Sequence, residues 1–358
     1  MAAGHTGDRS DTSRVSILQW LILARKDFDM LTRTLWNGRE IPALGFGGWA
    51  IGGPFFAGTV PLGWGDVDDR QSIAAIHRAL DLGIRFFDTA ANYGGGHSEE
   101  ILGEALAGRH DAVIATKFGH VVDPTTKQSL GEEKSAAAIE AIVDTSLRRL
   151  RRDRIDLLQL HLNDLPLSDA EPIFEKLGAL RQAGKIDAFG WSTDNPDGAA
   201  AFAGRDGFVA IQHEMNLFRP ADAMIAVIER EGLLSINRSP LAMGLLTGKF
   251  VGGTALPAND VRVGSFEWLP YFTDGKVTPS YAARLAAIRE LLQSDGRTLA
   301  QGAIAWLWGR SARTLPIPGV RTPRQIEENA GALEKGPLPE AVMIEIDRVI
   351  GREGSVAA

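Results

Sequence analysis

The chain has 358 residues, 44% hydrophobic and 23% charged, a balance typical of a globular protein with a large core. Its formal charge of −7 leaves no general basic field, so we expect no nucleic-acid partner. Cysteine is absent, which excludes disulfides, thiolate catalysis and thiolate-based metal sites and suits a cytoplasmic location.

Residues 1–29 differ in composition from the rest of the chain. Residues 1–16 are small and polar, and residues 15–24 form an apolar run that Arg25, Lys26 and Asp27 close. Such a run is too short to cross a bilayer, and its flanks do not fit a secretory signal, so we expect no membrane partner. We interpret residues 1–29 as a disordered extension or an early assigned start, followed by a single domain over residues 30–358.

From Met30 onward the pattern is strand, then helix, repeated. Asn37-Gly38 predicts a β-hairpin between residues 31–35 and 40–42. Apolar runs typical of buried parallel strands follow at residues 43–47, 84–87, 112–116, 155–160, 186–191, 209–212, 233–236 and 314–317. Helical spacing of apolar residues predicts helices at residues 69–81, 135–150, 169–182, 221–231, 281–292, 300–308, 323–333 and 339–350.

This alternation predicts an α/β fold, a (β/α)8 TIM barrel with an N-terminal β-hairpin. An open doubly wound sheet is the alternative, and it requires a glycine-rich phosphate loop that leads directly into a helix. The glycines at residues 45–48 are instead followed by a long loop, which counts against the open sheet.

Two long insertions follow predicted strands. Residues 52–66 follow strand one, and residues 250–280 follow strand seven and carry Phe266, Trp268, Tyr271 and Phe272. Long loops in compact folds are usually functional, so we expect the second to be a lid over the C-terminal face of the barrel. Its aromatic residues either contact a ligand or form a small satellite core.

Four polar residues converge at this face. Asp88, Lys117 and His161 end strands two, three and four, and Tyr93 lies just beyond strand two. Each could be an ordinary strand cap or core residue, but packing does not explain four such residues at adjacent strand ends. We expect Lys117 to lower the pKa of Tyr93 from near 10, with Asp88 holding Lys117 and His161 donating a hydrogen bond to the same substrate oxygen. This chemistry needs no metal.

The chain resembles the aldo-keto reductase family. The resemblance lies in FFDTAANYGGGHSEEILGEAL, VIATKFG, RIDLLQLH, GKIDAFGWS, SPLAMGLLTGK and PIPGVRTPRQIEENAGAL, which cover the chain from Met30 onward. It implies that Tyr93 is the general acid/base, that Lys117 and Asp88 tune it, and that His161 orients a substrate carbonyl. It further implies hydride transfer from a nicotinamide, usually of NADPH, to an aldehyde or ketone.

The resemblance also implies the cofactor site. Ser192, Gln212 and Thr193 would hold the nicotinamide carboxamide, with Thr193 standing where many relatives have asparagine. The remaining implied contacts are Trp49, Arg238, Ser239, Pro240, Leu241, Gly244, Lys249, Gly319, Arg321, Gln325, Glu328 and Asn329.

Arg238 occupies a position where many relatives have an aromatic residue that stacks on the nicotinamide. A planar guanidinium can stack in the same way, and its charge would disfavour NADP⁺ relative to NADPH. The alternative is that Arg238 forms an ion pair with a neighbour.

The last part of the site concerns the cofactor's phosphate. Thr322 and Pro323 predict a helix start, whose N–H groups favour phosphate, and Arg321 and Arg324 add charge. This favours NADPH over NADH, unless both arginines are simply solvated.

The leading hypothesis is an NADPH-dependent carbonyl reductase, reversible in principle, that acts on a small-molecule carbonyl substrate as a monomer or weak homo-oligomer. Trp49, Phe55, Phe56 and Trp64 predict an aromatic mouth that suits aromatic aldehydes. The alternatives are a nicotinamide-binding sensor or regulatory subunit with little turnover, and a phosphate-binding barrel enzyme such as an isomerase or aldolase.

Overall fold

The structure is a computed structural model that describes Met1 and residues 30–250 and 255–352. Apart from Met1, the predicted N-terminal extension lies outside the described residues, as do residues 251–254 of the predicted lid.

Eight parallel strands form the central sheet of the described residues, and strands adjacent in the chain are adjacent in the sheet. In sheet order they are β3 (Gly45–Gly47), β6 (Phe86–Asp88), β7 (Val113–Phe118), β10 (Ile155–Leu160), β11 (Ile186–Ser192), β12 (Phe208–Glu214), β13 (Leu234–Arg238) and β16 (Thr314–Pro316). All eight predicted strands are confirmed, with ends displaced by up to two residues.

The sheet closes between its first and last strands. Gly47 forms a parallel bridge with Gly319, and its N–H donates to the carbonyl of Pro318 at 3.0 Å. A Cβ at Gly47 would lie 2.6 Å from the carbonyl oxygen of Ile317, so only glycine permits this approach. The predicted (β/α)8 barrel is confirmed.

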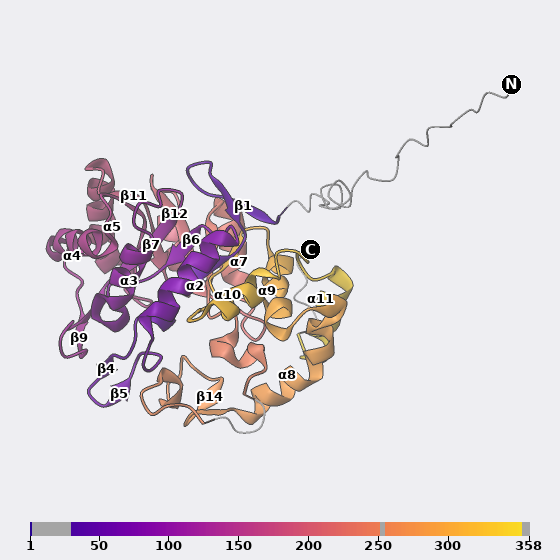
Figure 1. The fold of residues 1–358 in the computed structure, drawn as a ribbon. Coiled ribbons are helices and arrows are strands. Elements are labelled where there is room, and N and C mark those ends of the chain that lie inside the picture. The colour runs from indigo at the N-terminus through magenta and orange to yellow at the C-terminus, as the bar shows by residue number, and fades with distance from the viewer. Residues whose placement is uncertain (2–29, 251–254, 353–358) are drawn as a thin grey trace. The chain divides into compact units, whose positions relative to one another are not determined.

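Helices surround the strands (Figure 1). They are α2 (Asp69–Asp81), α3 (His97–Ala105), α4 (Ala136–Leu150), α5 (Leu167–Gln182), α6 (Pro196–Phe202), α7 (Asp222–Glu231), α8 (Pro279–Leu292), α9 (Leu299–Arg310), α10 (Pro323–Ala330) and α11 (Glu340–Val349). The apolar pattern predicted neither α3 nor α6, because nine and seven residues are too few to show a clear helical period. Within the described part of the chain, none of the helices combines the length and apolar character needed to cross a membrane.

The predicted N-terminal hairpin is confirmed and closes one end of the barrel. It pairs β1 (Thr32–Thr34) with β2 (Glu40–Pro42), and its Ile41 joins the apolar cluster inside the strands. Arg33 Nε donates to the carbonyl of Thr314 at 2.8 Å, at the start of β16. The opposite end, where the strands finish, therefore remains available for a site.

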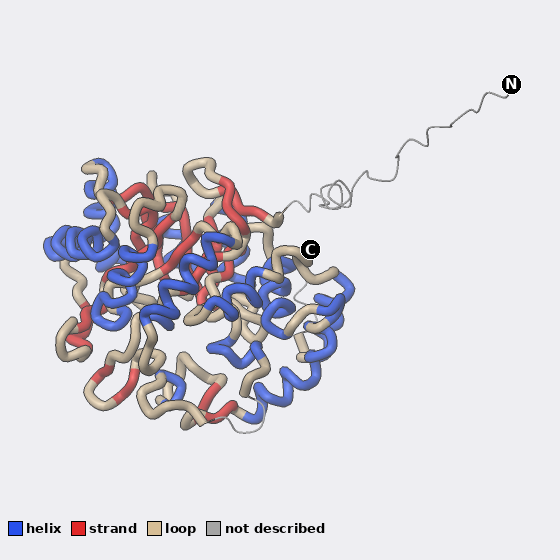
Figure 2. The backbone as a smooth tube through the Cα atoms, in the orientation of Figure 1, coloured by secondary structure: helices blue, strands red, loops and turns tan. Residues whose placement is uncertain are grey.

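The two long insertions meet beyond the strand ends. The first contains a hairpin of β4 (Phe56–Ala57) and β5 (Val60–Pro61), and the second contains η4 (Val261–Val263) and the hairpin of β14 (Phe272–Thr273) and β15 (Lys276–Val277). The N–H of Val261 donates to the carbonyl of Gly63 at 2.7 Å. Figure 2 shows these short strands set apart from the central sheet. A further hairpin, β8 (His120–Val122) with β9 (Ser129–Glu132), follows β7.

Candidate active site

A cavity of about 650 Å³ lies at the C-terminal ends of the strands, a size typical of small-molecule sites. Its lining includes residues from the ends of six barrel strands or from the loops that directly follow them: Gly47, Asp88, His161, Ser192, Gln212 and Arg238. Tyr93 lines it from the turn after β6. The predicted convergence of strand ends on one cavity is therefore what the structure shows.

Lys117 lies fully buried and joins two of the other predicted catalytic residues. Its Nζ donates to Asp88 Oδ2 at 2.6 Å, to the carbonyl of Thr89 at 2.8 Å and to Tyr93 Oη at 3.2 Å. On the adjacent parallel strands β6 and β7, Asp88 pairs in register with Ala115, two positions before Lys117. A buried ammonium is tolerated here because each of its three protons has an acceptor.

Burial sets the protonation of this group. Burial alone would lower the pKa of Lys117, but the Asp88 carboxylate and Tyr93 reverse the effect, so its pKa lies above the ordinary value and it stays cationic. Burial raises the pKa of Tyr93 above 10, and the opposing effect of Lys117 is smaller. Lys117 does lower the pKa of Tyr93, as expected, but desolvation of the phenolate outweighs the nearby cation, so the net direction is upward. Tyr93 is a protonated phenol at neutral pH.

Asp88 is held by two glutamines as well as by Lys117. Its Oδ1 accepts from Gln212 Nε2 at 2.7 Å and from Gln159 Nε2 at 3.4 Å. Burial raises the pKa of Asp88, and all three partners oppose the rise. Gln159 was not selected from the sequence, although a glutamine within the apolar strand β10 was a visible signal.

The three glycines after Tyr93 shape the turn η2 (Tyr93–Gly96). Gly94 has φ of 59°, and a Cβ there would lie 1.7 Å from the carbonyl oxygen of Gly52 in the first insertion. Arg149 on α4 donates to the carbonyl of Gly95 at 3.2 Å and pairs with the buried Glu99 at 3.3 Å. The turn is therefore packed on both sides, and this packing holds the backbone of Tyr93 in place.

His161 completes the predicted set. Its ring lies edge-on to the Tyr93 ring, with centroids 6.0 Å apart, and 5.1 Å from the ring of His120. Burial, together with the charge of Lys117, lowers the pKa of His161 well below 6.5, so the imidazole is neutral. Among the described residues its buried Nδ1 has no hydrogen-bond partner.

The predicted carboxamide residues divide into two groups. Ser192 and Gln212 line the cavity, whereas Thr193 is buried behind it. Thr193 Oγ1 donates to the carbonyl of Asn163 at 2.6 Å and accepts from the N–H of Asn195 at 3.1 Å. Asn163, which was not selected from the sequence, lines the cavity in its place.

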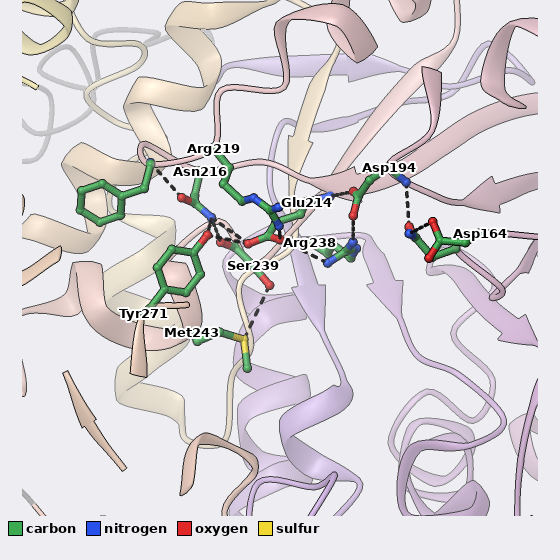
Figure 3. Close-up of polar contacts among 11 residues, drawn as sticks. Asp164, Asp194, Glu214, Asn216, Arg219, Arg238, Ser239, Met243 and Tyr271 are labelled. Atoms are coloured by element: carbon green, nitrogen blue, oxygen red, sulfur yellow. Dashed lines mark hydrogen bonds and ion pairs between the residues drawn. The ribbon is translucent and has the colours of Figure 1, made fainter. Parts of the chain in front are cut away.

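Arg238 forms ion pairs, which is the alternative that the sequence left open. Its guanidinium pairs with Asp194 through Nη2, and its Nη1 lies 3.8 Å from Glu214 Oε2 (Figure 3). Neither carboxylate was selected from the sequence, because each needs the fold to bring it beside Arg238. Stacking of Arg238 on a nicotinamide stays a prediction.

The lid aromatics divide between the main core and the lining of the cavity. Tyr271 and Phe272 are buried in the core, and Tyr271 Oη donates to Glu214 Oε1 at 2.6 Å. Trp268 is 43% exposed and lines the cavity, with its ring centroid 6.2 Å from that of Trp49.

Cationic side chains line another part of the cavity. Lys249 and Arg321 were predicted there, and Arg262 joins them, paired with Asp260 at 2.6 Å. The other predicted contacts that line the cavity are Trp49, Ser239, Pro240, Leu241, Gly244, Gly319, Gln325, Glu328 and Asn329. Arg324 is exposed and is not part of the lining.

At the start of α10, fewer backbone N–H groups are free to bind phosphate than the sequence predicted. Gln325 Oε1 accepts from the N–H groups of Arg321 at 2.7 Å and Thr322 at 3.2 Å, and Thr322 Oγ1 accepts from the N–H of Gln325 at 3.4 Å. This capping box occupies three donors that the sequence pattern left for phosphate. The Arg321 guanidinium also has partners, the carbonyls of Trp64, at 3.0 Å, and of Asp66.

Comparison with known proteins gives consistent matches. The model of the aldo/keto reductase family matches residues 43–350. Aldo-keto reductase YhdN of Bacillus subtilis is 32% identical over 300 residues, covering 81% of this chain and 85% of that protein. Aldo-keto reductase yakc [NADP(+)] of Schizosaccharomyces pombe is 29% identical, covering 88% of this chain and 90% of that protein. The glycerol dehydrogenase AKR11B4 from Gluconobacter oxydans has a similar structure, with a TM-score of 0.72 and 28% identity over 92% of this chain and 97% of that one.

Proposed function

The chain belongs to the aldo/keto reductase family, and from this premise we propose that it is an NADP-dependent oxidoreductase that reversibly reduces an aldehyde or ketone to an alcohol. The observation that carries the proposal is the contact of the buried Lys117 with both Asp88 and Tyr93 Oη at a cavity that His161 also lines.

The cavity residues fit a nicotinamide dinucleotide phosphate. Lys249, Arg262 and Arg321 supply cationic donors for phosphate groups, and relatives of this chain include one whose name carries NADP(+). The buried indole N–H groups of Trp49 and Trp64 have no partner among the described residues and are available to a ligand. Ser192 and Gln212 would hold the carboxamide, and Arg321 and Asn329 the adenosine end. NADPH would supply the hydride, and NADH is the less favoured cofactor.

The chain's own residues account for the movement of the proton. The neutral His161 donates a hydrogen bond to the carbonyl oxygen and polarises it. Tyr93 gives its proton to the same oxygen as the alcohol forms, and the phenolate left behind is stabilised by Lys117 at 3.2 Å. Asp88 keeps Lys117 in place. Oxidation of an alcohol reverses each step and needs Tyr93 as the phenolate.

The aromatic part of the cavity suits an apolar carbonyl compound. Trp49, Phe55, Trp64 and Trp268 line it, while Phe56 lies in β4 outside the lining, so the predicted mouth loses one member and gains another. We propose aromatic aldehydes as the first substrates to test.

The test is direct. Purified protein, NADPH and a nitrobenzaldehyde are mixed, and the loss of reduced-nicotinamide absorbance is followed. Steady turnover supports the proposal.

One relative, a probable voltage-gated potassium channel subunit beta of Arabidopsis thaliana, is 28% identical over 88% of this chain. Tight NADPH binding without turnover of any carbonyl would favour a regulatory role of that kind.

A further inference from the structure

Four charged side chains form a cluster at the cavity, and we call Asp194, Glu214, Arg219 and Arg238 the rim cluster (Figure 3). Asp194 pairs with Arg238, Arg238 lies 3.8 Å from Glu214, and Glu214 pairs with Arg219. Two carboxylates balance two guanidinium groups, so the cluster has no formal net charge.

Further hydrogen bonds fix the carboxylates in place. Asp194 Oδ1 accepts from the N–H of Glu214 at 2.7 Å, and Glu214 Oε1 accepts from Tyr271 Oη at 2.6 Å. Asn216 Nδ2 donates to the same Tyr271 oxygen at 2.9 Å. These bonds hold both carboxylates beside Arg238, so they offset its charge in part.

Arg238 acts electrostatically on the reacting groups. After burial and the nearer charges, its cation is among the causes that lower the pKa of His161, and it opposes the rise in the pKa of Tyr93. Hydride transfer to a carbonyl held by Tyr93 and His161 requires the nicotinamide ring beside that carbonyl. The ring would therefore lie within reach of the same charge, and it is cationic only when oxidised.

We propose that Asp194, through its ion pair with Arg238, sets the relative affinity of the site for the oxidised and the reduced nicotinamide. The inference rests on the proposed function. An unpaired Arg238 would repel the oxidised ring, as expected from the sequence, whereas the paired Arg238 accommodates both forms of the cofactor. Asp194 acts through Arg238 and is a positioning residue.

The experiment measures two dissociation constants, for NADP⁺ and for NADPH, by quenching of tryptophan fluorescence, since Trp49, Trp64 and Trp268 line the cavity. Asp194→Asn removes one negative charge and keeps the acceptor for the N–H of Glu214. We expect the Kd of NADP⁺ to rise about tenfold relative to that of NADPH.

Two further variants separate charge pairing from other effects. Asp164→Asn is the matched control, because Asp164 also lines the cavity but accepts its hydrogen bond from Asn163 Nδ2 at 2.7 Å, and it should leave the ratio unchanged. The double variant Asp194→Asn/Arg238→Gln restores neutrality and should return the ratio toward the wild-type value.

An unchanged ratio in Asp194→Asn, an equal change in Asp164→Asn, or no return in the double variant would each overturn the inference. A purely structural role of Asp194 would weaken both cofactors alike, which also overturns it. Failure of the proposed function is a different result, in which the wild-type protein binds neither nicotinamide or reduces no carbonyl.

Discussion

At the scale of single residues, the chemistry proposed for the cavity depends on one buried cation. Lys117 is completely buried, and its three donor contacts with Asp88, Thr89 and Tyr93 fix where its charge lies. Burial keeps Tyr93 protonated, and if Tyr93 gives up its proton as proposed, the buried phenolate would depend on Lys117 for stabilisation. In the proposed mechanism, the proton donor and the cation that stabilises the resulting phenolate are therefore in direct contact.

Tyr93→Phe tests the proton donor. The variant keeps the ring beside Trp49, 5.9 Å between centroids, but has no hydroxyl group to protonate the carbonyl oxygen. We expect kcat for carbonyl reduction to fall by at least about 100-fold, because a positioned general acid usually accelerates a reaction by at least that factor. The Kd of NADPH should be nearly unchanged. Tyr281→Phe, on α8 outside the cavity lining, is the matched control. Substantial turnover by Tyr93→Phe would contradict the assignment.

Sequence predicted these residues to different degrees. The strand-end positions of Asp88, Lys117 and His161 follow from local apolar runs, so the alternating pattern was sufficient to place them together. The hydroxyl of Thr193 donates its hydrogen bond to the carbonyl of Asn163, 30 positions away in the chain, and no local pattern reveals that contact. The pKa of Tyr93 depends on desolvation by the assembled fold, which the sequence does not display.

At the scale of elements, the turn η2 positions Tyr93 and depends on close approach to the first insertion. Gly94→Ala would place a Cβ 1.7 Å from the carbonyl oxygen of Gly52 and would also impose a positive φ on a residue with a side chain. We expect the free energy of unfolding to fall by about 2–4 kcal/mol and kcat to fall as Tyr93 moves.

Gly108→Ala is the matched control for this turn. Gly108 has φ of 72°, and no atom lies within 4 Å of the position that its Cβ would take, so the variant isolates the conformational cost, about 1 kcal/mol. Both free energies come from urea unfolding followed by fluorescence. Equal losses in the two variants would show that the contact with Gly52 does not matter.

A second element, the loop that precedes α10, connects the cavity to the first insertion. Arg321 reaches the carbonyls of Trp64 and Asp66, whereas the sequence offered either a phosphate contact or solvation for it. A backbone carbonyl is a weaker partner for a guanidinium than a phosphate is, so a cofactor phosphate would compete for Arg321.

Arg321→Ala tests this role. We expect kcat/KM with NADPH to fall about tenfold, because a charge-assisted contact with phosphate is lost, while kcat/KM with NADH changes little. Arg324→Ala, an exposed arginine three positions later, is the control and should leave both values unchanged. Retention of the NADPH preference in Arg321→Ala would remove the residue from the phosphate site.

At the scale of the whole molecule, the barrel was predictable because its parts repeat. Each strand in the interior of the sheet pairs with its neighbours in sequence, so a regular alternation of apolar runs and helices specifies the order. The closure at Gly47 and Gly319 and the union of the two insertions join segments far apart in the chain. The predicted barrel implied closure, but the residues that form these contacts depend on shape and not on local pattern, so the sequence did not identify them.

The stability of the whole barrel should fall in mild acid, and His213 is one measurable cause. His213 is fully buried on β12, with Nε2 2.8 Å from Ser235 Oγ, and burial lowers its pKa from 6.5 to about 4. Above pH 6.5 the histidine is neutral in both states. Between pH 6.5 and 4 the unfolded chain binds a proton that the folded chain does not. The free energy of unfolding therefore decreases, by up to about 3 kcal/mol, as the pH is lowered through this range.

His213→Gln isolates this contribution, since carboxylates also titrate in the same range. We expect the difference in unfolding free energy between the wild type and His213→Gln to shift by about 2–3 kcal/mol in favour of the variant from pH 7 to pH 4.5, measured by urea unfolding. His110→Gln, an exposed histidine, should give a difference that changes far less over the same range. Parallel pH profiles for the wild type and His213→Gln would mean that His213 takes up its proton without unfolding, and that the barrel opens locally around β12 to admit it.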